Sequence, residues 1–311
     1  MYYSSHSSHP SPSSYSSAVS ALPGPFAQSC WMGSCESMNQ AEWLMVGLPY
    51  DGTTSYRPGT RFGPEAIRTA SWGVETYSPQ LDRDLSAIKY YDAGDLDFPI
   101  GNREKILAQI YTNTKETLAL GKKWLGIGGE HLVSFPAFQA YAEQYPDIGI
   151  LHFDAHADLR DDFLGEPLSH ATVLRRMIDC ISPDRLVQVG IRSGPKEEFD
   201  WMKTHNTLVQ SREMLGSALA RLKNRPVYLT VDLDVLDPAV LPGTGTPEPG
   251  GMLFNELIAW LLDFSGLTVV GADVVELSPH YDPSGSSSVV AAKLIREILL
   301  LFSEQSLCSE Q

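Results

Sequence analysis

Residues 148–158 read IGILHFDAHAD, an apolar run that stops abruptly in acids and histidines. Comparable apolar runs occur at 43–48, 88–92, 124–128, 148–153, 186–191, 207–210, 227–231 and 267–274. Several are apolar at successive rather than alternate positions, which is typical of strands that helices cover on both faces. We therefore interpret the runs as eight strands of a parallel sheet.

Stretches with helical periodicity separate these strands. The predicted helices cover 63–69, 103–121, 135–144, 170–180, 196–204, 211–222, 255–264 and 286–302. Strands that alternate with helices indicate βαβ units, and no repeat or linker interrupts the pattern. We predict one α/β domain over residues 41–303. A flexible Ser/Pro-rich arm is predicted at 1–40, where ten serines fall within residues 1–21, and a short tail at 304–311.

Charge and composition exclude several classes of partner. The chain of 311 residues has 38 acidic and 23 basic side chains, a formal net charge of −15. That sign argues against nucleic acid or an anionic membrane and suits a small cationic substrate. No apolar run is long enough for a membrane span, and four cysteines are too few for a disulfide scaffold. The first basic residue is Arg57, so no basic leader is evident, and we expect a cytoplasmic protein.

The acidic end of the quoted stretch predicts a metal site. Asp154, His156 and Asp158 alternate along the chain, and on a strand they would share one face. Such groups, brought together at a buried strand end, repel and desolvate one another unless a cation lies between them. The position also suits a binding site, because open parallel sheets bind small molecules and ions at the carboxyl ends of their strands.

Two further strand ends carry candidate ligands. Asp232 and Asp234 close the apolar run at 227–231, whereas Asp237 precedes a proline and is predicted to cap a turn. His131 follows a glycine-rich segment at 126–129, where small residues let the backbone approach closely and leave the imidazole free to reach inward.

The six predicted ligands favour a pair of divalent ions. They comprise His131, Asp154, His156, Asp158, Asp232 and Asp234. A set rich in oxygen, with some imidazole and no thiolate, suits manganese better than structural zinc, although nickel also fits. Four carboxylates allow two ions to share bridging ligands, and such a pair makes water a nucleophile at neutral pH. The sequence therefore predicts a hydrolase.

The motifs that carry these residues resemble those of the ureohydrolase family of arginases and agmatinases. They read GGEH at 128–131, FDAHADLR at 153–160, TVDLDVLDPAVLPGTGTPEPGG at 230–251 and GADVVELSP at 271–279. The similarity extends over about residues 43–302 and includes GLPYDGTTSYRPGTRFGPEAIR at 47–68. It implies a three-layer α/β/α sandwich with a mostly parallel eight-stranded sheet, and a homotrimer or homohexamer.

The resemblance also implies a role for each site residue. One manganese ion would be held by His131, Asp154, Asp158 and Asp232. The other would be held by Asp154, His156, Asp232 and Asp234, with Asp154 and Asp232 as bridges. His170 resembles the family's proton-transfer histidine, and Glu276 the glutamate that binds the substrate guanidinium. Glu130 departs from the family pattern, because many members have aspartate at this position.

The loop between Asp158 and His170 suggests which guanidino compound is cleaved. It lacks the Asn, Ser and Thr pattern with which arginases hold an amino acid, and its ending at 166–170 looks like that of bacterial agmatinases. Its acids, Asp161, Asp162 and Glu166, would attract the terminal ammonium of agmatine. Arg160 would instead hold the carboxylate of guanidinobutyrate. We favour agmatine over guanidinobutyrate, guanidine or arginine.

Two alternatives from other classes stay open on the sequence alone. A metal-dependent deacetylase shares this general architecture, but it uses a single zinc ion and does not need the whole two-ion set. A catalytically silent binding subunit would have lost ligands, and none is lost here. The metal content distinguishes the three: two manganese ions per chain, one zinc ion, or none.

Overall fold

The computed structural model describes residues 31, 33–34 and 37–304. Its centre is an eight-stranded sheet in the order β4-β1-β5-β10-β9-β6-β7-β8, in which every neighbouring pair is parallel. The strands are β1 (Trp43–Gly47), β4 (Tyr90–Asp95), β5 (Lys123–Ile127), β6 (Gly149–Phe153), β7 (Leu186–Val189), β8 (Leu208–Val209), β9 (Pro226–Asp232) and β10 (Thr268–Val275). All eight predicted strands are present, and the predicted fold class is confirmed.

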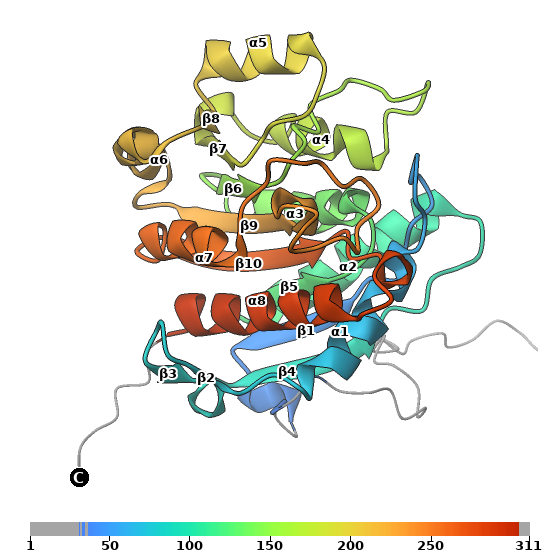
Figure 1. Ribbon diagram of the computed structural model, residues 1–311, viewed down its shortest axis with the longest axis vertical. Helices are drawn as coiled ribbons and strands as arrows, with labels where there is room; N and C mark the ends of the chain where they lie inside the picture. The colour runs from blue at the N-terminus through green and yellow to red at the C-terminus, as the bar shows by residue number, and fades with distance from the viewer. Residues whose placement is uncertain (1–30, 32, 35–36, 305–311) are drawn as a thin grey trace, which may run out of the picture.

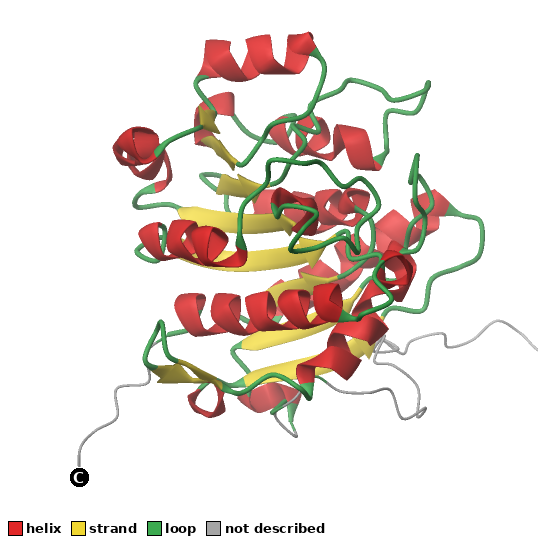
Figure 2. Ribbon diagram, viewed as in Figure 1, coloured by secondary structure: helices red, strands yellow, loops and turns green. Residues whose placement is uncertain are grey.

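Helices cover both faces of this sheet, which gives three layers (Figures 1 and 2). They are α1 (Gly63–Ser71), α2 (Arg103–Ala119), α3 (Ser134–Gln144), α4 (Val173–Ile178), α5 (Lys196–His205), α6 (Leu215–Leu222), α7 (Phe254–Asp263) and α8 (Ser286–Phe302). Helix α8 packs on α1 and α7, while α3 packs on α2 and α4. Two separate apolar clusters result, one on each face, and both faces of the strands are buried. This explains the continuous apolar runs in the strands.

The last strand, β10, lies in the middle of the sheet. It pairs with β5 on one side and with β9 on the other, so the strand nearest the C-terminus joins the two halves of the sheet. Ile127, Val274, Val231 and Phe153 stand in register across β5, β10, β9 and β6. The carboxyl ends of these four strands therefore form one continuous edge, where the site residues emerge.

The structure differs from the sequence interpretation at a few places. A short hairpin, β2 (Tyr77–Ser78) with β3 (Arg83–Asp84), was not predicted, because two-residue strands leave no readable periodicity. Two predicted helices open with a 3₁₀ turn, at His170–Thr172 and at Arg212–Met214. The predicted arm lies almost entirely outside the described residues, and so does the tail beyond residue 304. Within the described ranges, no helix combines the length and hydropathy that crossing a membrane requires.

Candidate active site

The loop after β6 carries three of the predicted metal ligands. The strand ends at Phe153, as predicted, so the strand alternation invoked for Asp154, His156 and Asp158 was wrong, because these residues lie in the loop beyond it. The loop folds back on itself, with the His156 N–H donating to Asp154 Oδ1 at 2.6 Å. Asp158 has a left-handed backbone (φ 54°), which a residue with a Cβ adopts only at a cost. A constrained loop, rather than strand alternation, turns these side chains together.

His131 reaches the same place from the end of β5. Gly128 and Gly129 both have positive φ (73° and 78°), and a Cβ on Gly129 would lie 2.3 Å from the Leu48 carbonyl oxygen. This is the close backbone approach predicted for the glycine-rich segment. The His131 N–H then donates to Glu276 Oε1 at 2.7 Å, which ties the turn to the end of β10.

The histidines and acids converge into one buried cluster. His131 Nδ1 lies 3.1 Å from Asp154 Oδ2, 3.1 Å from Asp158 Oδ2 and 3.4 Å from Asp232 Oδ2. On the other side, His156 Nδ1 lies 3.0 Å from Asp234 Oδ2 and 3.6 Å from Asp154 Oδ1. The Asp154 carboxylate thus lies between the two predicted histidine ligands, with Oδ2 toward His131 and Oδ1 toward His156. All six predicted ligands belong to this cluster.

Hydrogen bonds behind His131 fix which ring nitrogen faces the cluster. Thr230 Oγ1 donates to Asp273 Oδ1 at 2.6 Å, so it accepts from His131 Nε2, 2.9 Å away. Nδ1 then faces the carboxylates of Asp154, Asp158 and Asp232, which favour a proton or a metal ion at this nitrogen. It is fully buried and has no hydrogen-bond partner among the described residues. An imidazole held this way by its far nitrogen is a typical metal ligand.

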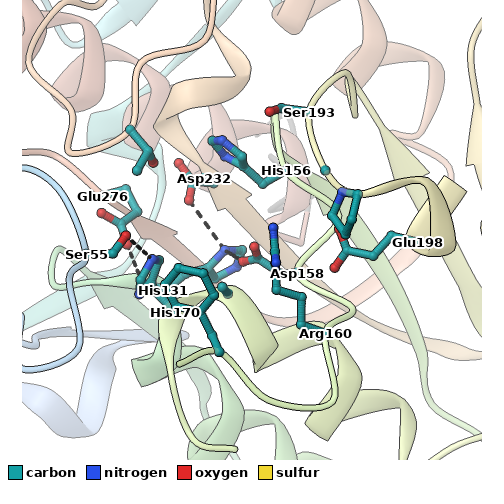
Figure 3. A pocket seen from close by; sticks show the side chains of 15 residues that line it. Ser55, His131, His156, Asp158, Arg160, His170, Ser193, Glu198, Asp232 and Glu276 are labelled. Carbon is teal, nitrogen blue, oxygen red and sulfur yellow. Dashed lines mark hydrogen bonds and ion pairs between the residues drawn. The ribbon is translucent and has the colours of Figure 1, made fainter. Parts of the chain in front are cut away.

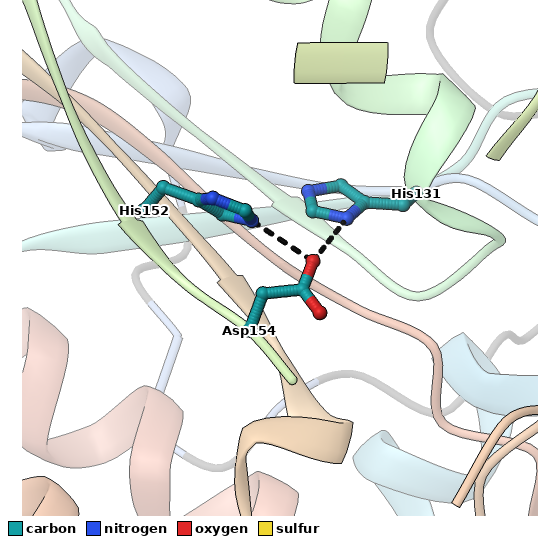
Figure 4. Close-up of side chains that lie close together, drawn as sticks. All are labelled: His131, His152 and Asp154. Atoms are coloured by element: carbon teal, nitrogen blue, oxygen red, sulfur yellow. Dashed lines mark hydrogen bonds and ion pairs between the residues drawn. The ribbon is translucent and has the colours of Figure 1, made fainter. Parts of the chain in front are cut away.

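His152 is a member of the cluster that sequence reasoning left out. It is completely buried on β6, and its Nε2 lies 2.9 Å from Asp154 Oδ2 (Figure 4). Gln188 on β7 contacts the opposite ring nitrogen at 3.3 Å. Among the described residues, two groups of side chains are close enough to hold an ion: His131, His152 and Asp154, and Asp154, His156 and Asp234. Asp158 and Asp232 of the predicted set belong to neither group. The sequence feature that could have identified His152 is its position as a lone histidine within an apolar strand.

The electrostatics of the cluster favour bound cations. Burial, with Asp234 and Asp154 nearby, raises the pKa of Asp232 well above its ordinary value. Against the lowering effect of burial, Asp234 and Asp154 raise the pKa of His156 to about 12. Carboxylates packed this densely out of water need positive charge. The donor set, without thiolate in the cluster, fits hard or intermediate divalent ions.

A cavity of about 460 Å³ opens over the cluster (Figure 3). His170 lines it and begins the 3₁₀ turn before α4; its Nε2 lies 3.1 Å from Ser55 Oγ. Burial lowers the pKa of His170, which favours the neutral ring. The remaining lining residues are Ser55, His131, His156, Asp158, Arg160, Phe163, Ala171, Ser193, Gly194, Pro195, Glu198, Asp232, Thr246 and Glu276.

Glu276 lines the cavity directly after β10. Its backbone is left-handed (φ 68°), like that of Asp158, so the chain turns sharply as it leaves the sheet. Burial, and Glu130 nearby, raise the pKa of Glu276 well above its ordinary value. A buried carboxylate with this raised pKa gains from a cationic ligand in the cavity.

The three acids predicted to set specificity do not line the cavity. The Asp161 side chain is 80% exposed and pairs with Arg175, Nε to Oδ1 at 3.0 Å. Asp162 accepts the Gly165 N–H at 3.0 Å. Glu166 pairs with Arg103 on α2. Among the four predicted specificity residues, only Arg160 reaches the cavity, with its guanidinium 5.1 Å from the centre of the Phe163 ring.

One carboxylate that the sequence did not suggest, Glu198, does line the cavity. Glu198 lies in the first turn of α5, is 5% exposed and lines the cavity. Its Oε1 accepts the Leu159 N–H at 2.8 Å, which fixes the carboxylate beside the metal-ligand loop. Burial, and then Asp158, raise the pKa of Glu198 to about 7. Its place shortly after β7 was the signal that could have found it.

The turn residue Asp237 behaves as predicted. It accepts the Ala239 N–H at 2.9 Å through Oδ1, and the N–H groups of Gly250 and Gly251 at 2.8 and 3.0 Å through Oδ2. It closes the loop after Asp234 and takes no part in the cluster.

Comparisons with known proteins identify the family of the chain. The arginase family model matches residues 41–301. An agmatinase from Bacillus anthracis is 49% identical over 269 residues, covering 85% of this chain and 93% of the relative. The human mitochondrial guanidino acid hydrolase is 34% identical over 268 residues, covering 82% of this chain and 76% of the relative.

A solved structure is similar to this chain over most of its length. The agmatine ureohydrolase of Thermoplasma volcanium superposes with a TM-score of 0.80 at 30% identity, covering 89% of this chain and 95% of that one. These likenesses decide against the deacetylase and the silent subunit. The chain belongs to the arginase family, and it is a hydrolase that cleaves a C–N bond of guanidino compounds.

Proposed function

We propose that the protein hydrolyses agmatine to putrescine and urea with two manganese ions. The observation that carries this is the position of two carboxylates on opposite sides of the cavity: Glu276 on one side and Glu198 on the other, with the cluster between them (Figure 3). Agmatine is cationic at both ends, as a guanidinium and as an ammonium. Each end then meets a carboxylate.

The metal ions would be held by the six clustered residues. The first set is His131, Asp154, Asp158 and Asp232, and the second is Asp154, His156, Asp232 and Asp234. The buried Nδ1 of His131 supports the assignment, because it lies among the carboxylates of Asp154, Asp158 and Asp232, where a metal ion would bind the nitrogen and the carboxylates together. Two divalent ions would lower the pKa of a shared water and so supply the nucleophile. Manganese suits this oxygen-rich set, and nickel is the alternative.

Two protein groups then act on the substrate itself. Glu276 binds the planar guanidinium, which stays protonated at neutral pH, and orients its central carbon toward the cluster. His170 donates a proton to the leaving nitrogen, since expulsion of an unprotonated amide ion is far too slow. Its lowered pKa keeps the ring neutral, so His170 first takes up a proton that the attacking water loses and then passes it to the leaving nitrogen.

A second candidate substrate has an observation in its favour. Arg160 lines the same cavity, and its guanidinium could hold the carboxylate of a guanidino acid such as guanidinobutyrate. One relative is a guanidino acid hydrolase, although at lower identity than the agmatinase. Glu198 is the better buried and more firmly held of the two groups, so we place agmatine first.

Substrate preference tests this order. With manganese-loaded protein and a panel of agmatine, guanidinobutyrate, guanidine and arginine, urea release should be fastest from agmatine. A well-placed charge contact contributes about 1.5–3 kcal/mol, so kcat/KM for agmatine should exceed that for guanidinobutyrate by roughly ten- to a hundredfold. Glu198→Gln should narrow this gap, whereas Arg160→Ala should hardly affect agmatine. If guanidinobutyrate is the best substrate and Arg160→Ala removes the preference, Arg160 selects the substrate and agmatine is excluded.

We also propose a homotrimer or homohexamer. Exposed aromatic side chains such as Tyr56 and Trp72, each 66% exposed, are of the kind that subunit interfaces cover. Analytical ultracentrifugation at micromolar concentration should give three or six times the chain mass, and a monomer would exclude the proposal.

A further inference from the structure

Glu130 is a buried carboxylate beside the active site that no step above uses. It is completely buried, yet it does not line the cavity. Burial raises the pKa of Glu130 to about 7. A carboxylate in such a place is costly unless its hydrogen bonds compensate, so the partners of Glu130 show what it does.

Among the described residues, every hydrogen bond to the Glu130 carboxylate comes from one loop. Thr53 donates twice, from N–H to Oε2 at 2.8 Å and from Oγ1 to Oε1 at 2.6 Å. Thr54 Oγ1 donates to Oε2 at 3.1 Å. The Glu130 N–H in turn donates to the Tyr50 carbonyl at 2.7 Å. Glu130 therefore anchors residues 50–54 to the end of β5.

The anchored loop holds His170 at two points. Thr53 Oγ1, while donating to Glu130, accepts the His170 N–H at 3.0 Å. Two residues further on, Ser55 Oγ lies 3.1 Å from His170 Nε2 (Figure 3). One contact fixes the backbone of the 3₁₀ turn and the other fixes the ring. A continuous path thus runs from Glu130 through Thr53 to His170.

We propose that Glu130 and Thr53 are positioning residues that set the place of the His170 ring over the cavity. The inference rests on the proposed role of His170. The carboxylate of Glu130 holds Thr53, and the Thr53 hydroxyl holds the turn that carries the imidazole. Only a hydroxyl can donate to the carboxylate and accept from the His170 N–H at once. Proton transfer needs this precision, because a misplacement of about 1 Å can cost about 10²-fold in rate.

The test compares three variants of the loop in the manganese-loaded protein, each assayed on the best substrate of the guanidino panel. Thr53→Val keeps the shape but removes both hydrogen bonds of the hydroxyl, and should lower kcat by up to about 10²-fold with KM little changed. Thr53→Ser restores the hydroxyl and should recover most of the rate. Thr54→Val is the matched control: it removes one hydrogen bond to Glu130 without touching His170, and should stay close to wild type.

Glu130→Gln tests the other end of the path. This change preserves the side-chain volume but presents an amide NH₂ to one of the donors. It should lower kcat, as Thr53→Val does, while the metal content is retained. The proposal is overturned if Thr53→Val is as fast as Thr53→Ser, or if Thr54→Val loses as much rate as Thr53→Val.

Crystal structures of Thr53→Val and Thr53→Ser separate this inference from the proposed function. If the wild-type protein cleaves no guanidino compound, the proposed function is wrong. The position of the His170 ring in the two structures then tests the positioning role by itself. A His170 ring displaced in Thr53→Val and restored in Thr53→Ser supports the positioning role. An undisplaced ring in both variants overturns it.

Discussion

Asp232→Asn should abolish urea release and lower the manganese content of the purified protein. The Asp232 carboxylate lies 3.4 Å from His131 Nδ1, and the Asp234 N–H donates to its other oxygen at 2.9 Å. As a proposed bridge it must offer charge to both ions, and an amide offers neither the charge nor a second oxygen lone-pair set. Breaking a buried charge network typically costs about 3–5 kcal/mol, enough to empty a site of micromolar affinity.

The measurement is metal per chain by mass spectrometry together with the rate of urea release. Asp237→Asn is a matched control, because Asp237 lies in the same motif but bonds only backbone N–H groups of its own turn. That variant should keep both ions and activity. If Asp232→Asn retains two ions and most of its rate, the two-metal assignment is wrong.

His170→Ala should keep both ions but slow turnover by on the order of 10²–10⁴-fold, the usual loss of a general acid or base. The His170 Nε2 contacts the Ser55 hydroxyl at 3.1 Å and no carboxylate of the cluster among the described residues, so metal content should not change. The measurements are kcat, which should fall, and metal per chain, which should stay the same. His205→Ala is the control, since His205 bonds the Trp201 carbonyl at 2.9 Å on α5 and does not line the cavity. Loss of metal from His170→Ala would make His170 a ligand instead.

The fold was predictable because the sheet is buried on both faces. Each internal strand is a mostly apolar run, and the cluster of polar residues that follows marks its carboxyl end, so β5, β6, β9 and β10 could be located within a few residues. The β2–β3 hairpin was not predictable, since its strands are two residues long. Elements of that length are decided by neighbours in space, such as the Ser78 hydroxyl bond to Glu297 at 2.7 Å.

The candidate metal cluster was predictable for the same reason. Acids and histidines directly after apolar strands must meet at one edge of a parallel sheet. The orientation of the side chains was not, because the left-handed turn at Asp158 follows from loop closure and not from a repeat. The prediction of the specificity residues was wrong because partners distant in sequence hold the acids away from the cavity. Asp161 pairs with Arg175 on α4, and Glu166 pairs with Arg103 on α2. Charge in a loop does not reveal which way it points.

The central place of β10 has a consequence for how the protein is made. During synthesis the ribosome releases the end of β5 and the ends of β6 and β9 long before Thr268–Val275 emerges, and these two halves share no strand pairing until β10 enters between them. His131 and Asp232 therefore come together only when almost the whole chain is available. Until then the paired strands β6 and β9 carry the whole of the second proposed ligand set, Asp154, His156, Asp232 and Asp234, whereas the first set lacks His131. The order of the strands therefore makes the first proposed ligand set one of the last parts of the site to be completed.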